Sequence, residues 1–172
     1  MIDKKQEKFL SLYKPVHNSF ERFCRARACR QMDFRDLMND TLVIAFQKFD
    51  LIKSEKAFLS FLIGISIRVI ANHSRKKRLL VSASEELIND IPAESRTDSR
   101  AEVYMLHQAI AKLPASQKES IILYEITGFS IKEIAKMQDV SESAVKKRLE
   151  RGRKKLLQLL TSTPLSHNNP QE

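Results

Sequence analysis

The side chains best suited to a chemical role are Lys and Arg residues gathered near the end of the chain. Residues 141–155 read SESAVKKRLERGRKK, and the cations are Lys146, Lys147, Arg148, Arg151, Arg153, Lys154 and Lys155. Clustered positive charge suits a polyanion, of which DNA and RNA are the commonest. The chemistry expected here is therefore binding to phosphates and bases.

Local signals place this basic segment on the second of two short helices. Ser130 can cap the first helix, and Glu133 three residues later completes a capping box. Residues 137–140 can form the turn, because Asp139 tolerates a left-handed backbone better than most residues other than glycine. Ser141 can then cap the basic helix.

The apolar residues fit the packing of a helix-turn-helix. The small Ala135 permits close approach of two steeply crossing helices, and Val140 can plug the turn. One apolar stripe on the second helix consists of Val145, Leu149, Leu156 and Leu160. An amphipathic helix pair with a solvated charged face is the alternative. Together the signals favour a helix-turn-helix whose second helix enters the major groove by its N-terminal end.

A second group of cations ends a predicted helix at about residues 57–78. The exposed end carries Arg68, Asn72, His73, Arg75, Lys76, Lys77 and Arg78. Cations near a helix C-terminus are favourable by themselves, so a capping role is one interpretation. Four cations in a row exceed what a cap needs, which favours nucleic acid. His73 alone is expected to be a surface residue.

Composition predicts a helical protein. The chain has 172 residues, is 42% hydrophobic, and has only three Gly and five Pro, with a net charge of +9. The basic clusters lack the flanking apolar face of interfacial membrane helices. The N-terminus has no apolar h-region of a signal peptide, and the longest apolar run, residues 58–67, is too short to span a bilayer. These observations favour a cytoplasmic location.

No pattern typical of an enzyme is present in the sequence. The four His residues are scattered at positions 17, 73, 107 and 167, without a Ser/His/Asp or Cys/His triad. Neither a Gly-rich phosphate loop nor a metal-ligand spacing occurs, so we expect no cofactor and no metal. Cys24 and Cys29 are five residues apart on a predicted helix; zinc or a disulfide is an alternative, but free thiols in a reducing cytoplasm are favoured.

The remaining pattern predicts two helical modules. A short helix is expected at 4–13, where Pro15 either interrupts it or begins the next helix, and Asp33 is expected to cap a helix at about 34–49. A polar loop at 50–56 precedes the helix at 57–78, and an acidic linker follows at 79–100. The second module comprises a helix at 101–112, which carries Val103, Leu106, Ala109 and Ile110, and a helix at about 114–127, with Gly128 at its C′ position. The helix-turn-helix follows. Residues 161–172 are expected to be disordered.

One surface of the predicted helix at 34–49 has two interpretations. Asp36, Asn39 and Asp40 lie beside the apolar Val43, off the stripe that faces the core. The residues alone fit a docking face and a solvated helix face equally well.

These features resemble the extracytoplasmic-function (ECF) sigma factors of bacterial RNA polymerase over about residues 9–160. The segment LPASQKESIILYEITGFSIKEIAKMQDVSESAVKKRLERGRKKL is similar to region 4 of that family. The segment FRDLMNDTLVIAFQKF is similar to region 2.2, and AFLSFLIGISIRVIANHSRKKR to regions 2.3 and 2.4. The resemblance implies an all-α fold of two small helical domains, region 2 at 1–78 and region 4 at 101–160, joined by a flexible acidic linker.

The resemblance also implies partners and roles. Core RNA polymerase, through its β′ and β subunits, and promoter DNA are the implied partners, with a possible anti-sigma factor. The face Asp36, Asn39, Asp40 and Val43 would dock on the β′ clamp helices. The −10 element would be read as melted strand by Lys53, Arg68, Asn72, Arg75, Lys76, Lys77 and Arg78. The acidic linker would thread the RNA path of the polymerase.

The implied reading of the −35 element assigns two groups of side chains. Glu142, Ser143, Lys146 and Lys147 at the start of the recognition helix can reach base edges. Arg148, Arg151 and Arg153 are expected to hold phosphates, although Arg148 or Arg151 could instead brace the fold through Glu119 or Glu133.

Several positions depart from the family pattern. Phe61 stands where Trp is usual, and Arg68 and Asn72 stand where Asn and Asp are common. In the second module the departures are Gln138 and Asp139 for Leu-Gly, Ala144 for Thr, and Gly152 for Ala. Arg68, Asn72 and Ala144 bear on promoter preference, not on the class of protein.

Three other classes of protein fit the sequence less well. A stand-alone helix-turn-helix regulator would leave the Asp36 face and the acidic linker without a purpose. A helical interaction protein, such as an anti-sigma or sigma-mimicking module, would favour acidic patches over the Arg75–Arg78 run. A DNA-processing enzyme would need clustered carboxylates or a nucleophile.

Overall fold

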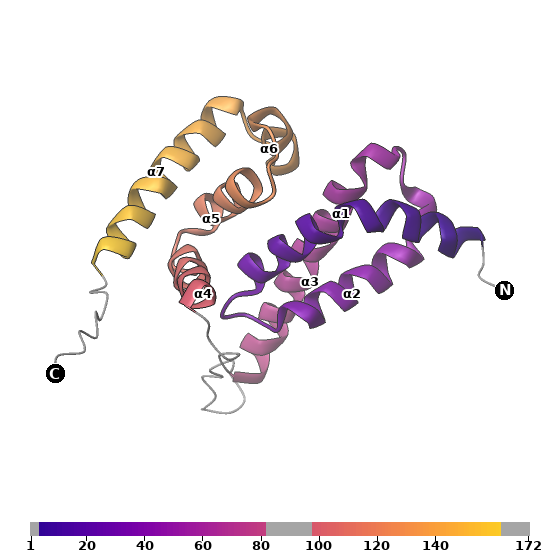
Figure 1. The fold of residues 1–172 in the computed structure, drawn as a ribbon, viewed down its shortest axis with the longest axis horizontal. Helices are drawn as coiled ribbons and strands as arrows, with labels where there is room; N and C mark the ends of the chain where they lie inside the picture. Colours follow the sequence, from indigo (N-terminus) through magenta and orange to yellow (C-terminus); the bar gives the residue numbers. More distant parts are fainter. Residues whose placement is uncertain (1–3, 82–97, 163–172) are drawn as a thin grey trace.

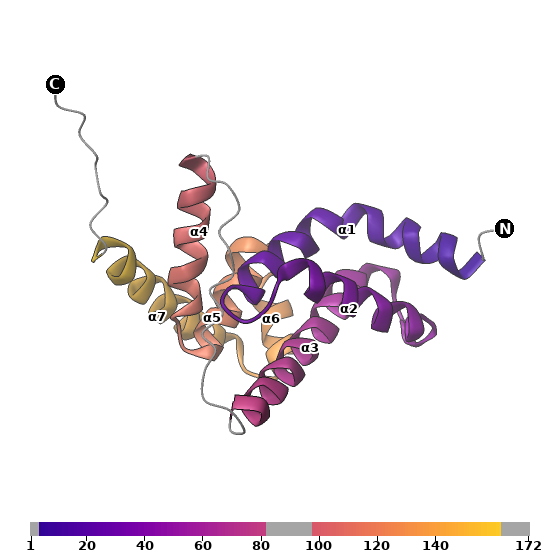
Figure 2. The same ribbon diagram turned by 90° about the horizontal axis from the view of Figure 1, so that it is seen from below.

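The computed structural model describes residues 4–81 and 98–162, and these residues form helices without a β-strand. The first half contains α1 (Lys4–Ala28), α2 (Phe34–Gln47) and α3 (Phe58–Val81), with short 3₁₀ turns at Phe49–Leu51 and Glu55–Ala57. The second contains α4 (Asp98–Ala111), α5 (Ala115–Ile121), a π-helical turn (Ile122–Ile126), α6 (Ile131–Gln138) and α7 (Glu142–Thr161). Figures 1 and 2 show α1–α3 on one side and α4–α7 on the other. The all-α prediction is confirmed.

The predicted break near Pro15 is wrong, because α1 continues through this residue as one helix. A proline inside a helix removes one backbone hydrogen bond. Phe9 before it and Phe20 and Phe23 after it are all buried. Burial of apolar side chains on both sides of Pro15 holds the two segments in line and outweighs the lost bond.

The core of the first half is aromatic at one end. Phe9 makes edge-to-face contacts with Phe46, Phe49 and Phe58, with ring centroids 5.4, 5.3 and 5.3 Å apart. This is the favourable geometry for aromatic rings. It joins α1, the α2 end and the start of α3, and so positions the loop at residues 50–56 between them.

The local signals for helix starts and ends are confirmed where the structure describes them. The carboxylate of Asp33 accepts from the backbone N–H of Arg35 at 2.7 Å and caps α2. Gly128 takes the predicted left-handed conformation after the π turn, with φ of 80°. The linker is shorter than predicted, because α3 extends to Val81 and α4 begins at Asp98. Its remainder and residues 163–172 of the predicted tail lie outside the described residues.

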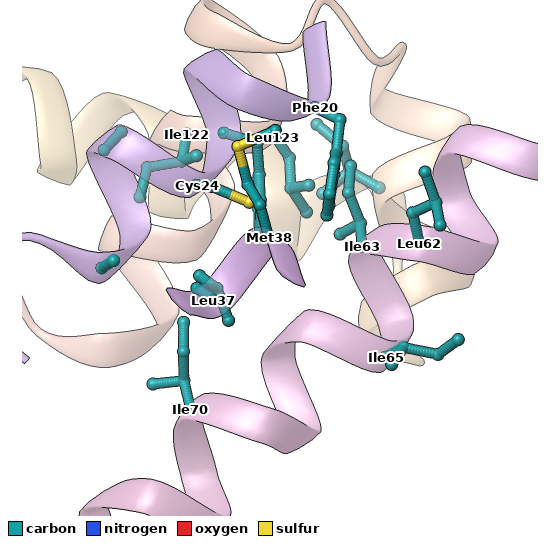
Figure 3. Packing of buried hydrophobic residues seen from close by; sticks show 14 of the residues in the cluster. Phe20, Cys24, Leu37, Met38, Leu62, Ile63, Ile65, Ile70, Ile122 and Leu123 are labelled. Atoms are coloured by element: carbon teal, nitrogen blue, oxygen red, sulfur yellow. The ribbon is translucent and has the colours of Figure 1, made fainter. Parts of the chain in front are cut away.

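The two halves pack against each other through α1. The end of α1 contacts α4 and the π turn, whose Ile122 and Leu123 are fully buried. Figure 3 shows these two residues pointing toward the cluster that contains Cys24 and Met38. The second half therefore completes the hydrophobic core of the first.

One stretch, Glu55–Leu80, is long and apolar enough to cross a membrane by length and composition, with 33% of it buried. Core helices of soluble proteins pass the same test. Here α3 packs on α1 and α2, where Leu62, Ile63 and Ile70 are buried. Its hydrophobicity is thus used in the protein core.

Candidate nucleic-acid interface

The helix-turn-helix forms as the local signals predict. The Ser130 hydroxyl accepts from the Glu133 backbone N–H, and the Glu133 carboxylate accepts from the Ser130 backbone N–H at 2.8 Å. The Ser130 hydroxyl also donates to the Glu133 carboxylate at 2.7 Å, and this bond, with the one from the Ser130 backbone N–H, holds the pKa of Glu133 below its usual value. Asp139 is left-handed, with φ of 51°, and Ser141 caps α7 by accepting from the Ala144 N–H.

Packing between α6 and α7 fixes the direction of the second helix. Ile134, Ala135, Val145 and Leu149 are buried where the two helices meet. The predicted stripe is correct for Val145 and Leu149, whereas Leu160 is 39% exposed because α7 extends past the core. The N-terminal turns of α7 are thereby held rigidly while its C-terminal end projects.

The start of α7 presents the side chains that were expected to reach bases. Glu142, Ser143, Lys146 and Lys147 are all exposed. Within residues 4–81 and 98–162, no ion pair involves any of them. Pairs four residues apart lie on neighbouring turns, so these side chains form one polar surface at the helix start. Their role in base reading remains a prediction.

Arg148 lies inside the helix-turn-helix and not on its outer face. One of its terminal nitrogens donates to Gln138 Oε1 at 2.6 Å, and the Ser120 hydroxyl donates to the same oxygen at 3.1 Å. These bonds link α5, α6 and α7. A bracing role was the stated alternative, but the partner is Gln138 and neither Glu119 nor Glu133.

Arg153 and Arg151 occupy different surroundings. Arg153 pairs with Glu125 at 2.7 Å and lies over the Tyr124 ring, so it braces α7 against the π turn. Arg151 is exposed and, with Lys154 and Lys155, lines an open cavity of about 380 Å³ beside α5. Of the three arginines expected to hold phosphates, Arg151 is the one that remains available.

The glycine at position 152 is explained by close packing. A Cβ atom at Gly152 would lie 2.9 Å from Ile121 Cγ1 and 3.2 Å from Cδ1. Ile121 is buried, so little room exists for either side chain. The departure from alanine at this position therefore lets α7 approach α5 closely.

The other predicted residues lie on exposed surfaces of the first half. Arg68, Asn72, Arg75, Lys76, Lys77 and Arg78 are exposed along α3, and Lys53 is exposed in the loop before it. On α2, Asp36, Asn39, Asp40 and Val43 share one exposed face, with Val43 59% exposed. The α2 residues share one face, whereas Lys53 lies before α3 and the cations at positions 75–78 lie toward its other end. The partners of both groups remain predictions.

The sequence pattern did not reveal the structural role of Gln138 or the orientation of α4. Gln138 was interpreted only as a turn residue. A long polar side chain in place of the usual Leu indicates, however, that nearby donors need a hydrogen-bond acceptor. On α4, the apolar Val103 and Leu106 are 51% and 37% exposed, whereas Ala109 and Ile110 are buried. The helix is oriented by contacts with α1 and α7, which its own periodicity does not reveal.

The described residues show no catalytic or metal-binding arrangement. Residues 4–81 and 98–162 contain no group of three or more His, Cys, Asp or Glu able to hold a metal ion. Cys24 is buried, which raises the pKa of its thiol to about 12. Burial also raises the pKa of Cys29 and lowers that of His107. These shifts oppose an activated thiolate or a charged imidazole.

Comparisons with known proteins agree with this geometry. Residues 104–156 match the family described as "Sigma-70, region 4". The chain is 30% identical to RNA polymerase sigma factor NccH of Alcaligenes xylosoxydans xylosoxydans, over 77% of the chain and 76% of that protein. It is 25% identical to ECF RNA polymerase sigma factor SigM of Mycobacterium tuberculosis, over 88% of the chain and 76% of that protein.

Solved structures show the same fold. The chain matches the sigma factor RpoE from a complex with the anti-sigma factor NepR of Bartonella quintana. The TM-score is 0.79 at 24% identity, and the match covers 91% of this chain and 98% of that one. CnrH in complex with the cytosolic domain of CnrY matches with a TM-score of 0.68 at 24% identity, over 91% and 90% of the two chains.

Proposed function

Because the chain belongs to the RNA polymerase sigma factors of the ECF group, we propose that its two halves divide the work of transcription initiation. The first half, residues 1–78, docks on core polymerase and binds the −10 element. The second, residues 101–160, reads the −35 element. The chain itself acts by binding, catalyses no reaction, and meets the polymerase in the cytoplasm.

The helix-turn-helix supports the −35 assignment most directly. The exposed start of α7 carries Lys146 and Lys147, while the buried Val145 and Leu149 fix that helix on its neighbours. A rigid helix with polar side chains at its N-terminal end is suited to the major groove. Glu142 and Ser143 complete the base-reading set, and Arg151 contacts phosphate. The proposal leaves out Arg148 and Arg153, since both have partners inside the fold.

The first half supplies two separate surfaces for the other contacts. The exposed face of α2, with Asp36, Asn39, Asp40 and Val43, is the docking site on the polymerase. The loop residue Lys53 and the exposed cations of α3 bind the melted −10 strand and its backbone. These surfaces belong to different helices, so both partners can be bound together.

We also propose that an anti-sigma factor restrains this protein. Two structures with the same fold were solved as complexes, RpoE with NepR and CnrH with CnrY. Purification of the tagged chain from its native cell should recover a stoichiometric partner that prevents core polymerase from binding. Recovery of free, fully active chain under all growth conditions would contradict this regulation.

Run-off transcription with bacterial core polymerase tests the function. The template is the DNA upstream of the gene itself, and the chain should be required for initiation. Asp36→Arg should abolish initiation by adding a cation to the docking face. Glu7→Arg is the matched control, because Glu7 is an exposed carboxylate on α1, and it should leave the transcript level unchanged.

A second arm separates docking from promoter reading. Lys146→Gln should leave core binding intact in gel filtration while lowering promoter-dependent transcript several-fold, since one base or backbone contact is lost. Absence of initiation by the wild-type chain, together with nanomolar duplex binding by the chain alone, would instead support a stand-alone helix-turn-helix regulator.

A further inference from the structure

An open cavity of about 400 Å³ lies on the first half of the protein, away from the helix-turn-helix. It is formed where the turn after α1 meets the C-terminal half of α3. Its lining residues are Arg30, Gln31, His73, Ser74, Lys77 and Arg78. The fold thus brings a residue from the α1–α2 turn beside the basic end of α3.

Every side chain that lines this cavity can donate a hydrogen bond, and none is a carboxylate. Gln31 Oε1 already accepts from an Arg27 guanidinium nitrogen at 3.3 Å, which leaves its amide group to donate. In the part of the chain that the structure describes, no carboxylate pairs with Arg30, Lys77 or Arg78. The cavity therefore suits an anion.

Cations at the other end of this half are neutralised within the fold. Lys5 pairs with Asp50 at 2.7 Å, and Lys8 pairs with Glu55 at 3.2 Å. Both pairs tie α1 to the segment before α3. By contrast, no carboxylate among residues 4–81 and 98–162 neutralises Arg30, so within this part of the chain its charge is available to bind an anion.

Arg30 is also held in an unusual backbone conformation. Its φ is 64°, in the left-handed region that favours glycine or asparagine. Hydrogen bonds from the N–H groups of Gln31 and Met32 to the Ala28 carbonyl, at 2.8 and 3.1 Å, close the turn around it. Glycine would satisfy this turn with less strain. An arginine kept at such a position is an observation that favours a functional role for its side chain.

The position of the cavity along α3 indicates which part of the DNA it meets. Lys77 lies about 30 Å from the start of α3 at Phe58, taking 1.5 Å per helical residue. The melted −10 strand is proposed to bind from the loop before Phe58 along the cations of α3, and the cavity lies at the far end of that row. DNA at the cavity therefore lies at the edge of the melted segment, where the duplex begins.

We propose that this cavity holds a backbone phosphate of the promoter duplex flanking the melted −10 region, with Arg30 as a principal cation. The inference rests on the proposed function and adds residues from the α1–α2 turn to its DNA-binding surface. A phosphate contact of this kind positions the duplex and carries no base sequence.

The test uses holoenzyme assembled with the Arg30→Gly variant and fluorescently labelled promoter DNA. Loss of one phosphate contact should lower affinity about fivefold near physiological salt, and reduce the slope of log affinity against log salt by about one. The loss should be equal on wild-type and mutated −10 sequences. The same variant should raise the melting temperature of the free chain by a few degrees, because glycine relieves the left-handed strain.

Two further variants complete the design. Lys14→Gln removes one exposed cation from α1 outside the cavity, and it should leave affinity and salt slope unchanged. Ser74→Asp adds a carboxylate to the cavity and should weaken duplex binding at least as much as Arg30→Gly. An unchanged salt slope in Arg30→Gly and Ser74→Asp, with normal initiation, would overturn the phosphate site and leave the proposed function standing.

A free anion is the other source of the same chemistry. Pyrophosphate added to the free chain should raise its melting temperature no more in wild type than in Arg30→Gly. Stabilisation confined to the wild type, with equal DNA affinity of both holoenzymes, would assign the cavity to a small phosphate ligand and overturn the duplex contact. If no variant supports initiation, but Arg30→Gly still loses salt slope on duplex DNA, the proposed function fails and the phosphate site stands.

Discussion

At the scale of single residues, two helical glycines have opposite surroundings. An added Cβ at Gly152 would lie 2.9 Å from the buried Ile121, on atom Cγ1. At Gly64, which is exposed on α3, it would meet nothing within 4 Å. The same substitution to alanine therefore has a packing cost at one position and none at the other.

Gly152→Ala should destabilise the protein by about 1 kcal/mol. Overpacking of a core costs about 1–3 kcal/mol, while replacing a helical glycine by alanine recovers up to about 1 kcal/mol. Gly64→Ala has only the second effect and should stabilise by about 0.5–1 kcal/mol. Urea unfolding at constant m-value measures both. Stabilisation of similar size by both variants would show that Ile121 moves aside freely.

At the scale of elements, the helix-turn-helix is held by a polar contact as well as by its apolar core. Gln138 Oε1 accepts from both Arg148 and Ser120, and so joins α5, α6 and α7. The contact is part-buried, where an unpaired polar group is costly. Arg148 and its neighbour Lys147 therefore have different tasks, although both belong to the same basic run.

Arg148→Met should lower the free energy of unfolding by about 1–2 kcal/mol, because Gln138 loses its charged donor. It should leave the salt slope of DNA binding unchanged. Lys147→Gln, on the exposed face, is the matched variant and should do the reverse, lowering the slope by up to about one with little change in stability. Denaturant unfolding and salt titrations on both variants measure the two effects. A lower salt slope in Arg148→Met would return Arg148 to the phosphate-binding set.

Elements whose ends are set by local chemistry could be predicted from the sequence. The caps at Asp33, Ser130 and Ser141 and the left-handed Asp139 depend on residues a few positions apart. The continuous α1 could not be predicted in this way, because contacts with α2 and α3 overrule Pro15.

The exposed cationic surfaces could be predicted from charge spacing, but two kinds of feature could not. Arg148 and Arg153 bind partners 10 and 28 residues away. Only the fold therefore shows that these two arginines are not available to bind phosphates. The left-handed Arg30 has no sequence signal, since glycine or asparagine is the usual marker of that conformation. Tertiary contacts decide both cases.

At the scale of the whole molecule, a charged contact joins the two halves beside their shared apolar core. Arg27 Nε lies 3.4 Å from Glu119 Oε2, with side chains only 14% and 16% exposed. Burial raises the pKa of Glu119, although Arg27 and Lys118 act in the opposite direction. The ionised carboxylate is thus held at a cost, and buried pairs of this kind add little net stability. The contact is suited to opening.

The proposed reading of two promoter elements by the two halves predicts such an opening. The −10 and −35 elements lie about 25 base pairs apart, or about 85 Å along the duplex. A compact chain of this length has a radius of gyration of about 16 Å. A closed molecule of that size is too small for its two halves to reach both elements. If the halves read the two elements as proposed, the packed arrangement belongs to the free protein, and we predict that initiation separates the halves.

Glu119→Arg should favour the separated state, because it places a third cation beside Arg27 and Lys118. Small-angle scattering should then show a radius of gyration of roughly 20 Å or more instead of about 16 Å. The double variant Arg27→Glu with Glu119→Arg restores opposite charges and should return the chain to its compact size. Glu125→Arg disrupts the Glu125–Arg153 pair within the second half and should leave the size unchanged.

Because the halves are already separated in Glu119→Arg, core polymerase should bind this variant at least as fast as wild type. A compact Glu119→Arg chain would show that Ile122 and Leu123 alone hold the halves together, which assigns the closed state to apolar packing.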